Sequence, residues 1–78
     1  MTNVAVRVKT PFEELEDILD LVRQAEAEVQ PHGGRVLLRY SGTEPKARLL
    51  IEGPDTAVMD RWSSAICGSI RRQVGKAD

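Results

Sequence analysis

The chain has 78 residues and a net charge of −1, with 41% hydrophobic and 29% charged residues. This length predicts one small domain, residues 1–78, with a modest core. The near-neutral charge disfavours a domain built to bind nucleic acid, and no uncharged run is long enough to cross a bilayer. The chain has a single cysteine, which is typical of a reducing compartment. We therefore expect a soluble, cytoplasmic α/β domain without a membrane or nucleic-acid partner.

The first half of the chain predicts a strand and then a helix. Valine alternates with other residues over 4–9, which predicts a half-buried strand with Val8 on the same face as the earlier valines. Thr10 is expected to cap a helix, with a proline at the first helical position and Glu13 completing a capping box. The helix carries one apolar stripe, comprising Leu15, Ile18, Val22, Ala25 and Val29. The sequence Pro-His-Gly-Gly at 31–34 is expected to end it.

The second half predicts two strands and another helix. The strands are expected over 35–40 and 47–52, and Asp55 of the following turn is expected to cap the last helix. One face of that helix carries Val58, Trp62, Ala65, Ile66, Ser69 and Ile70. Residues from Gly75 onward are expected to form a frayed tail. The order β-α-β-β-α predicts an α+β fold, a two-layer sandwich in which two helices cover one face of an antiparallel sheet.

An antiparallel hairpin closed by residues 40–47 has one register that separates polar from apolar side chains. Arg39 is paired with Arg48 in this register, and directly opposed residues share a face of the sheet. One face is then entirely apolar and carries Val36, Leu38, Leu49 and Ile51. A slip of one residue would place Leu38 against Arg48 and spoil both faces, so the register is well specified. The two arginines are therefore expected to lie side by side at the mouth of the loop.

Two opposed guanidinium groups repel each other, and a bound anion would relieve that repulsion. The planar fork of arginine matches a phosphate group bidentately. Ser41 and Thr43 offer hydroxyl donors, and Gly42 lets backbone N–H groups approach an anion closely and turn towards it. The loop therefore predicts a phosphate cradle. Two simpler arrangements stay open: Glu44 can lie between the arginines, or the pair can be solvated beside an ordinary turn. Neither GxGxxG nor GxxxxGK[ST] occurs.

The segment GRVLLRYSGTEPKARLLIEGPD, residues 34–55, resembles the C-terminal (fourth) domain of the α-D-phosphohexomutases. The loop in that family has the form R-x-S-G-T-E-P followed by an arginine. The upstream segment NVAVRVKTPFEEL and the acidic helix after it are most similar to bacterial phosphoglucosamine mutases. The resemblance extends over residues 3–74 and implies the TATA-box-binding-protein-like sandwich of phosphohexomutase C-terminal domains.

The resemblance also implies roles for the residues of the loop. The residues that match the family's binding site for the non-transferred phosphate of the substrate are Arg39, Ser41, Gly42 and Thr43. Arg48 matches the arginine of the following strand that completes this site, whereas Glu44 and Pro45 are expected to shape the loop. The sequence departs from the family pattern at Tyr40, where proline is common, and at Lys46-Ala47, where bulkier apolar residues are common.

The resemblance implies a fragment of an isomerase, a phosphosugar mutase that interconverts glucosamine 6-phosphate and glucosamine 1-phosphate for amino-sugar nucleotide and cell-wall synthesis. The phosphoserine and the Mg²⁺-binding aspartates of such enzymes belong to three preceding domains, which are the expected partners of this one. We therefore expect no catalytic residue, metal site or cofactor in these 78 residues, no mutase activity of the isolated chain, and weak phosphate binding.

Three alternative functions stay open on the sequence alone. The chain can be a domain of a phosphoglucomutase or phosphomannomutase, which share the loop. It can be an independently encoded anion-binding module, or a small nucleic-acid-binding domain, although its few aromatic residues disfavour the last. His32 is expected to be a solvated turn residue and Cys67 a buried thiol. Trp62 is expected in the core, and the cluster Arg61, Arg71 and Arg72 is expected to form a solvated face.

Overall fold

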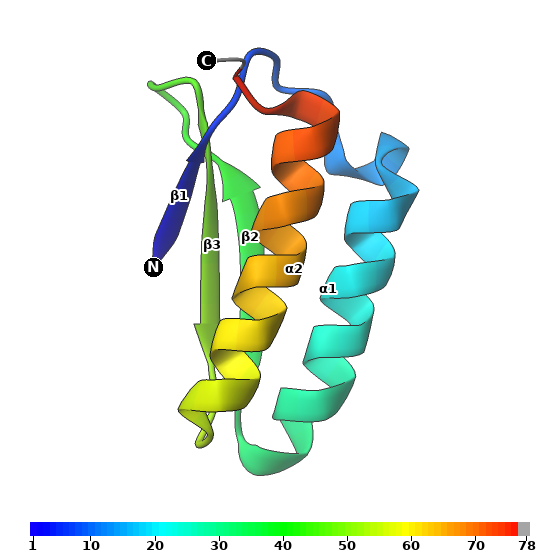
Figure 1. The fold of residues 1–78 in the computed structure, drawn as a ribbon, viewed down its shortest axis with the longest axis vertical. Helices are drawn as coiled ribbons and strands as arrows, with labels where there is room; N and C mark the ends of the chain where they lie inside the picture. The colour runs from blue at the N-terminus through cyan, green and yellow to red at the C-terminus, as the bar shows by residue number, and fades with distance from the viewer. Residues whose placement is uncertain (77–78) are drawn as a thin grey trace.

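A computed structural model of the chain, which describes residues 1–76, contains one sheet and two long helices (Figure 1). The elements in chain order are β1 (Thr2–Ala5), the 3₁₀ turn η1 (Phe12–Glu14), α1 (Glu16–Val29), the 3₁₀ turn η2 (Gln30–His32), β2 (Arg35–Tyr40), β3 (Lys46–Glu52) and α2 (Thr56–Val74). The predicted α+β architecture is confirmed, because the three strands form one antiparallel sheet and the two helices lie together on one face of it. No described helix is both long and apolar enough to cross a membrane.

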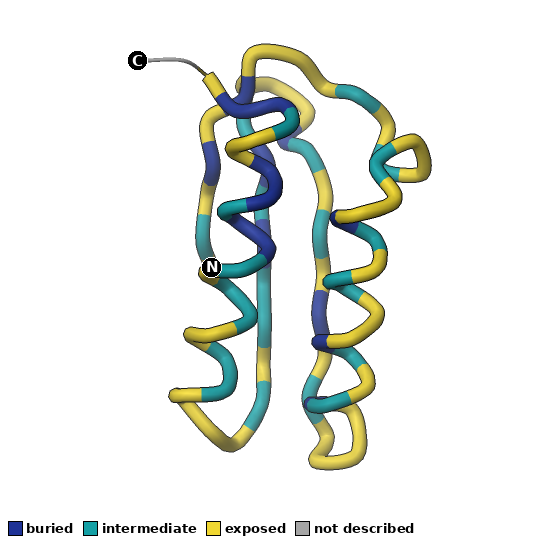
Figure 2. Tube along the Cα trace, turned by 45° about the vertical axis from the view of Figure 1, so that its right-hand side comes forward, coloured by how far each residue is buried: buried dark blue, intermediate teal, exposed yellow. Residues whose placement is uncertain are grey.

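The sheet has the strand order β1-β3-β2, with β3 in the centre. The predicted hairpin register is confirmed from Arg35 opposite Glu52 to Arg39 opposite Arg48. β1 pairs with the other side of β3, and this pairing sets Asn3 opposite Arg48. This register directs the apolar face of the hairpin, which includes Leu49, towards the helices. The buried residues of the helices in turn lie on the sides that face the sheet (Figure 2).

The core between the two layers is made of small and medium-sized aliphatic side chains. Its fully buried members include Ile18 of α1, Leu49 of β3, and Ile66 and Ile70 of α2. Burying a side chain of this size contributes roughly 1.5–3 kcal/mol, so each of these four is a substantial part of the stability of a domain this small. The predicted apolar stripes of both helices therefore do face the sheet. Cys67 is also buried, as predicted.

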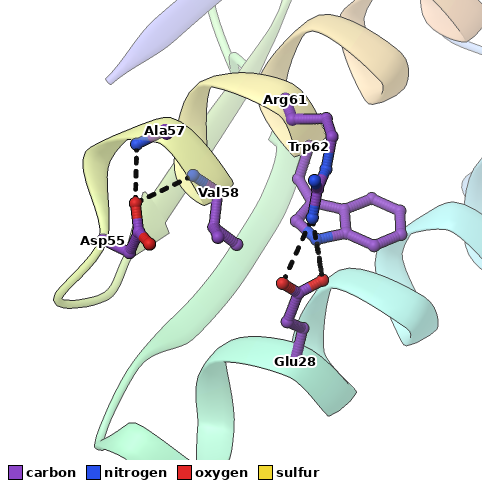
Figure 3. A network of polar contacts seen from close by, with 6 residues as sticks. All are labelled: Glu28, Asp55, Ala57, Val58, Arg61 and Trp62. Carbon is purple, nitrogen blue, oxygen red and sulfur yellow. Dashed lines mark hydrogen bonds and ion pairs between the residues drawn. The ribbon is translucent and has the colours of Figure 1, made fainter.

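The turns at the lower end of Figure 1 position the two helices on the sheet. Gly33 has a φ of 80°, a left-handed conformation that favours glycine, and it ends η2. A Cβ atom at Gly34 would lie 2.2 Å from the carbonyl oxygen of Glu52, so the start of β2 approaches the end of β3 too closely for any side chain. Asp55 caps α2 as predicted, since its carboxylate accepts hydrogen bonds from the N–H groups of Ala57 and Val58 (Figure 3).

The segment after β1 differs from its prediction. The strand ends at Ala5, and Val8 is 47% exposed instead of sharing the buried face of Val4. Thr10 makes no capping bond: the chain first forms η1, and α1 then begins at Glu16 after a non-helical Leu15, without a side-chain cap. The capping-box prediction is therefore wrong, because residues 7–11 cross the top of the sheet before any helix begins.

The prediction of a frayed tail is wrong for Gly75 and Lys76, because both residues are bound to the segment that follows β1. The N–H of Lys76 donates to the carbonyl of Ala5, and Gly75 forms a bridge with Val6. The side chain of Arg7 donates to the carbonyls of Gln73 and Gly75 at 2.9 and 3.1 Å. These bonds satisfy carbonyl groups at the end of α2 that would otherwise lack partners. The remaining residues of the expected tail, 77–78, lie outside the described part of the chain.

Candidate functional site

Arg39 and Arg48 are directly opposed on β2 and β3, on the face of the sheet that the helices leave uncovered. They lie next to the 41–45 loop, at the end of the hairpin. The next pair along the same face is Leu37 with Leu50, and Leu37 is 49% exposed. The farthest pair is Arg35 with Glu52, which form an ion pair across the hairpin. One end of this face is therefore neutralised, whereas the end beside the loop carries two positive charges.

No carboxylate of residues 1–76 forms an ion pair with Arg39 or Arg48. Glu44, the one acidic residue of the loop, instead lies 3.5 Å from the ammonium group of Lys46. The alternative in which Glu44 lies between the arginines is therefore wrong. The Nε atom of Arg48 is buried and has no hydrogen-bond partner among the described residues. A buried donor without a partner costs roughly 1–3 kcal/mol, so this arrangement of Arg48 lowers the stability of the domain.

The loop between β2 and β3 is closed by its own backbone. The N–H of Ser41 donates to the carbonyl of Lys46 at 2.9 Å, and the N–H of Lys46 donates to the carbonyl of Glu44 at 2.8 Å. The Ser41 hydroxyl is buried and accepts from the N–H groups of Thr43 and Glu44 at 3.4 and 3.2 Å. Ser41 therefore shapes the loop, although its hydroxyl keeps a proton that it can donate.

Gly42 and Thr43 form the exposed tip of the loop. Gly42 does not use a left-handed conformation, since Gly33 is the described glycine with a positive φ. Its lack of a side chain matters in another way: a Cβ atom there would meet nothing within 4 Å, so the backbone at Gly42 is open to an approaching group. Among residues 1–76, no group accepts a hydrogen bond from the Gly42 N–H. The tip thus offers an uncommitted backbone donor and the Thr43 hydroxyl.

Tyr40 anchors the start of the loop to the segment that precedes α1. Its ring stacks on Phe12 with centroids 4.2 Å apart and an interplanar angle of 10°. Its hydroxyl donates to the carbonyl of Thr10 at 2.5 Å. Burial raises the pKa of Tyr40 above its ordinary value, because desolvation disfavours the phenolate. The aromatic residue at this position therefore has a structural reason, which is to dock residues 10–12 beside the loop.

Lys9 belongs to the candidate site although the sequence did not indicate it. Its ammonium group donates to the carbonyl of Ser41 at 2.5 Å, across 32 residues of sequence. The sequence predicts a strand over 4–9, which would place Lys9 on a face of the sheet. A residue in that place gives no reason to expect a contact with the 41–45 loop. The structure shows that the strand ends earlier, and the bond from Lys9 holds the following segment against the start of the loop. Only the tertiary arrangement brings Lys9 to Ser41.

A shallow depression of about 180 Å³ lies on the uncovered face of the sheet beside the arginines. It is lined by Met1, Leu37, Leu38, Arg39, Arg48 and Leu50. A hollow of about 400 Å³ lies at the opposite end of the molecule, near Glu28 and Asp55. The carboxylate groups of both residues there are already committed, to Trp62 and Arg61 and to the start of α2 respectively (Figure 3). Of these two hollows, the depression beside the arginines is the one lined by cationic side chains without an ion-pair partner among residues 1–76.

The described residues contain no second arrangement that suggests chemistry. Within residues 1–76, no three His, Cys, Asp or Glu side chains lie close enough together to hold a metal ion. Ser69, which the sequence places on the apolar face of the last helix, is 2% exposed and accepts a hydrogen bond from Gln73. Trp62 is half-buried against the core and donates to Glu28 at 2.9 Å. His32 is exposed, as predicted.

Comparison with known proteins gives one family. The phosphoglucomutase/phosphomannomutase C-terminal domain matches residues 1–69. The phosphoglucosamine mutase of Nitratidesulfovibrio vulgaris is 40% identical over 95% of this chain and 16% of that protein. The phosphoglucosamine mutase of Solibacter usitatus is 40% identical over 97% of the chain and 17% of that protein, and that of Alkalilimnicola ehrlichii is 42% identical over 91% and 16%. The chain therefore spans 16–17% of the length of these relatives. No solved structure matches it significantly.

Proposed function

Because the chain belongs to the phosphoglucomutase/phosphomannomutase C-terminal domain family, we propose that it binds the phosphate group of a phosphosugar at Arg39, Arg48 and the tip of the loop. Arg39 and Arg48 supply the charge and the bidentate hydrogen-bonding geometry that a phosphate group requires. Gly42 and Thr43 add a backbone and a hydroxyl donor. Ser41 holds the loop closed, and Glu44 and Pro45 shape it.

The observation that carries the proposal is the unsatisfied state of the arginine pair. Arg48 has a buried Nε without a partner among residues 1–76, and it is directly opposed by a second arginine. Elsewhere on the same face, Arg35 has its own carboxylate. A fold that leaves two opposed cations unpaired gives up stability that a bound dianion would restore, and inorganic or sugar-linked phosphate is such a dianion.

We further propose that the longer protein to which this domain belongs is a phosphoglucosamine mutase, which interconverts glucosamine 6-phosphate and glucosamine 1-phosphate. The names of the curated relatives support this choice over a phosphoglucomutase or phosphomannomutase. Residues 1–76 offer no group of metal ligands. Following the family resemblance, we propose that the Mg²⁺ ion and the phosphoryl transfer belong to the remaining domains of the parent, and no step of the reaction is assigned to this chain.

The contribution of this domain would then be binding and orientation. Holding the phosphate that is not transferred fixes one end of the substrate, so the other end is presented to the reacting groups in a limited set of orientations. Such positioning converts binding energy into a higher rate of the chemical step. In each half of the reaction the arginines would hold the phosphate that is not being transferred, so after the bisphosphate intermediate reorients the same contacts can hold the phosphate that the product retains.

Titration of the 78-residue chain with phosphate and with glucosamine 6-phosphate, followed by the NMR shifts of the Gly42 and Thr43 amides, tests the binding site. We expect weak, saturable binding that the double variant Arg39→Ala/Arg48→Ala abolishes. The matched control is Arg71→Ala/Arg72→Ala, which removes the same charge from α2 and should bind as the wild type does. Shifts confined to amides outside the loop, or equal losses in both double variants, would refute the proposed site.

A further inference from the structure

The hydrogen bond from Lys9 to the carbonyl of Ser41 determines how the peptide at the tip of the loop is oriented. The donor is an ammonium group, and hydrogen bonds from charged donors are roughly twice as strong as neutral ones. Its acceptor is the carbonyl of the Ser41–Gly42 peptide bond, which is trans like all described peptide bonds. Lys9 therefore restrains a single peptide plane at the entrance to the candidate anion site.

In a planar trans peptide, the carbonyl and the following N–H point in opposite directions. Lys9 binds the carbonyl of Ser41, so the N–H of Gly42 points away from Lys9. Gly42 is exposed, and its N–H has no acceptor among residues 1–76. The geometry thus separates the two ends of the peptide: the acceptor end is occupied by a cation of the chain, and the donor end is uncommitted.

This restraint is needed because of the glycine. A peptide next to glycine can rotate between orientations that a residue with a Cβ atom would disfavour. If the Ser41–Gly42 peptide rotated, the carbonyl would replace the N–H at the exposed tip and would repel an anion. We propose that Lys9 is a positioning residue of the phosphate-binding loop, which holds the Ser41–Gly42 peptide with the N–H of Gly42 directed towards the bound phosphate. This inference rests on the proposed function.

The neighbours of Lys9 keep it in place. Thr10 accepts the hydroxyl of Tyr40, and Phe12 stacks on the ring of the same tyrosine. The segment from Lys9 to Phe12 is therefore attached to the end of β2 at three points. This attachment lowers the entropic cost of the bond between Lys9 and the Ser41 carbonyl, because the backbone of the segment is already fixed relative to the loop and only the side chain has still to be ordered.

The test uses the 78-residue chain and compares Lys9→Met with Lys9→Arg and with Arg72→Gln. Lys9→Met removes the donor, Lys9→Arg retains a cationic donor, and Arg72→Gln removes one charge from the helical layer. The readouts are the carbonyl ¹³C shift of Ser41, the exchange rate of the Gly42 amide and the affinity for inorganic phosphate. Circular dichroism identifies variants that remain folded.

We expect Lys9→Met to move the Ser41 carbonyl shift without phosphate and to weaken phosphate binding roughly three- to tenfold, because apparent affinity falls with the fraction of loops in the competent orientation. Lys9→Arg should recover most of the affinity, and Arg72→Gln should bind as the wild type does. If Lys9→Met binds phosphate normally, or if Arg72→Gln weakens binding equally, the role of Lys9 is refuted. Loss of binding in Arg39→Ala/Arg48→Ala alone would leave the proposed function standing, whereas unchanged binding in that double variant would refute the function itself.

Discussion

Arg39 and Arg48 are directly opposed across the β2–β3 hairpin, and neither forms an ion pair within residues 1–76. Directly opposed like charges weaken a sheet, and the buried Nε of Arg48 has no partner in the same part of the chain. The pair is therefore expected to lower the stability of the free domain. The free energy of unfolding of the domain, measured with and without an anion, therefore tests the proposed binding of an anion at this pair.

Replacing Arg48 by methionine should raise the free energy of unfolding in chloride buffer by about 0.5–1.5 kcal/mol, because it removes both the repulsion and the unsatisfied donor. Phosphate at about ten times its dissociation constant should stabilise the wild type by about 1.4 kcal/mol. The variant should gain nothing from phosphate. Urea unfolding in phosphate and in chloride of equal ionic strength measures both effects. Equal stabilisation of the two proteins by phosphate would contradict the prediction.

Two glycines should respond to alanine in opposite ways. At Gly34 a Cβ atom would lie 2.2 Å from the Glu52 carbonyl oxygen, so Gly34→Ala must separate β2 from β3 and should cost more than about 2 kcal/mol. At Gly42 a Cβ atom meets nothing within 4 Å, so Gly42→Ala should change stability by less than about 0.5 kcal/mol. The same Gly42 variant should bind phosphate more weakly, because the new methyl group occupies the approach to the loop. Unfolding curves and phosphate titrations of both variants decide this, and normal phosphate binding by Gly42→Ala would count against a close backbone contact.

The single tyrosine of the chain makes its titration unambiguous. Burial raises the pKa of Tyr40 above 10.0, so the folded state retains the phenol proton more strongly than the unfolded state does. The resulting stabilisation is fully present below pH 10 and is lost as the pH rises through the pKa of the folded state. Ultraviolet absorbance of the phenolate should show a midpoint at higher pH in the folded chain than in the chain unfolded by urea. Coincident midpoints would mean that the docking of Tyr40 on Thr10 and Phe12 is absent in solution.

Glu28 of α1 is expected to contribute more to the stability of the packing between α1 and α2 than its position at the surface indicates. Its carboxylate accepts from Trp62 at 2.9 Å and from Arg61 at 3.2 Å (Figure 3). Glu28→Ala leaves the half-buried indole N–H unpaired and should cost about 1–2 kcal/mol. Arg61→Ala removes only an exposed ion pair and should cost less than about 1 kcal/mol. Urea unfolding followed by fluorescence of the single tryptophan compares them, and a larger loss in Arg61→Ala would show that the ion pair dominates.

The register of the hairpin was predictable because the alternation of apolar residues fits only one pairing of the two strands. Only one register gathers Val36, Leu38, Leu49 and Ile51 on one face, and the structure has that register. The same alternation identified the arginine pair as neighbours. The resemblance to the phosphohexomutase C-terminal domain is confirmed by the family that matches residues 1–69. The phosphate-binding role of the loop residues stays a prediction.

The segment between β1 and α1 was not predictable, because its structure is decided by contacts that are distant in sequence. Thr10 followed by Pro11 and Glu13 satisfies the local rule for a helix start, yet the carbonyl of Thr10 is held by the hydroxyl of Tyr40. Val8 follows the strand pattern but lies beyond the last residue that pairs with β3. The participation of Lys9 in the loop depends on this same crossing. Local propensity was overruled here by tertiary packing.

The bonds between Arg7 and the end of α2 also constrain the order in which the domain can fold. They join residues 66 and 68 positions apart, so they close a loop that includes almost the whole chain. Such a closure is entropically expensive unless the intervening hairpin and helices have already formed, whereas β2 and β3 pair across a short loop. The hairpin that carries the arginines can therefore form early, and the attachment of the segment that follows β1 to the completed α2 is expected to be a late step that governs how fast the domain unfolds.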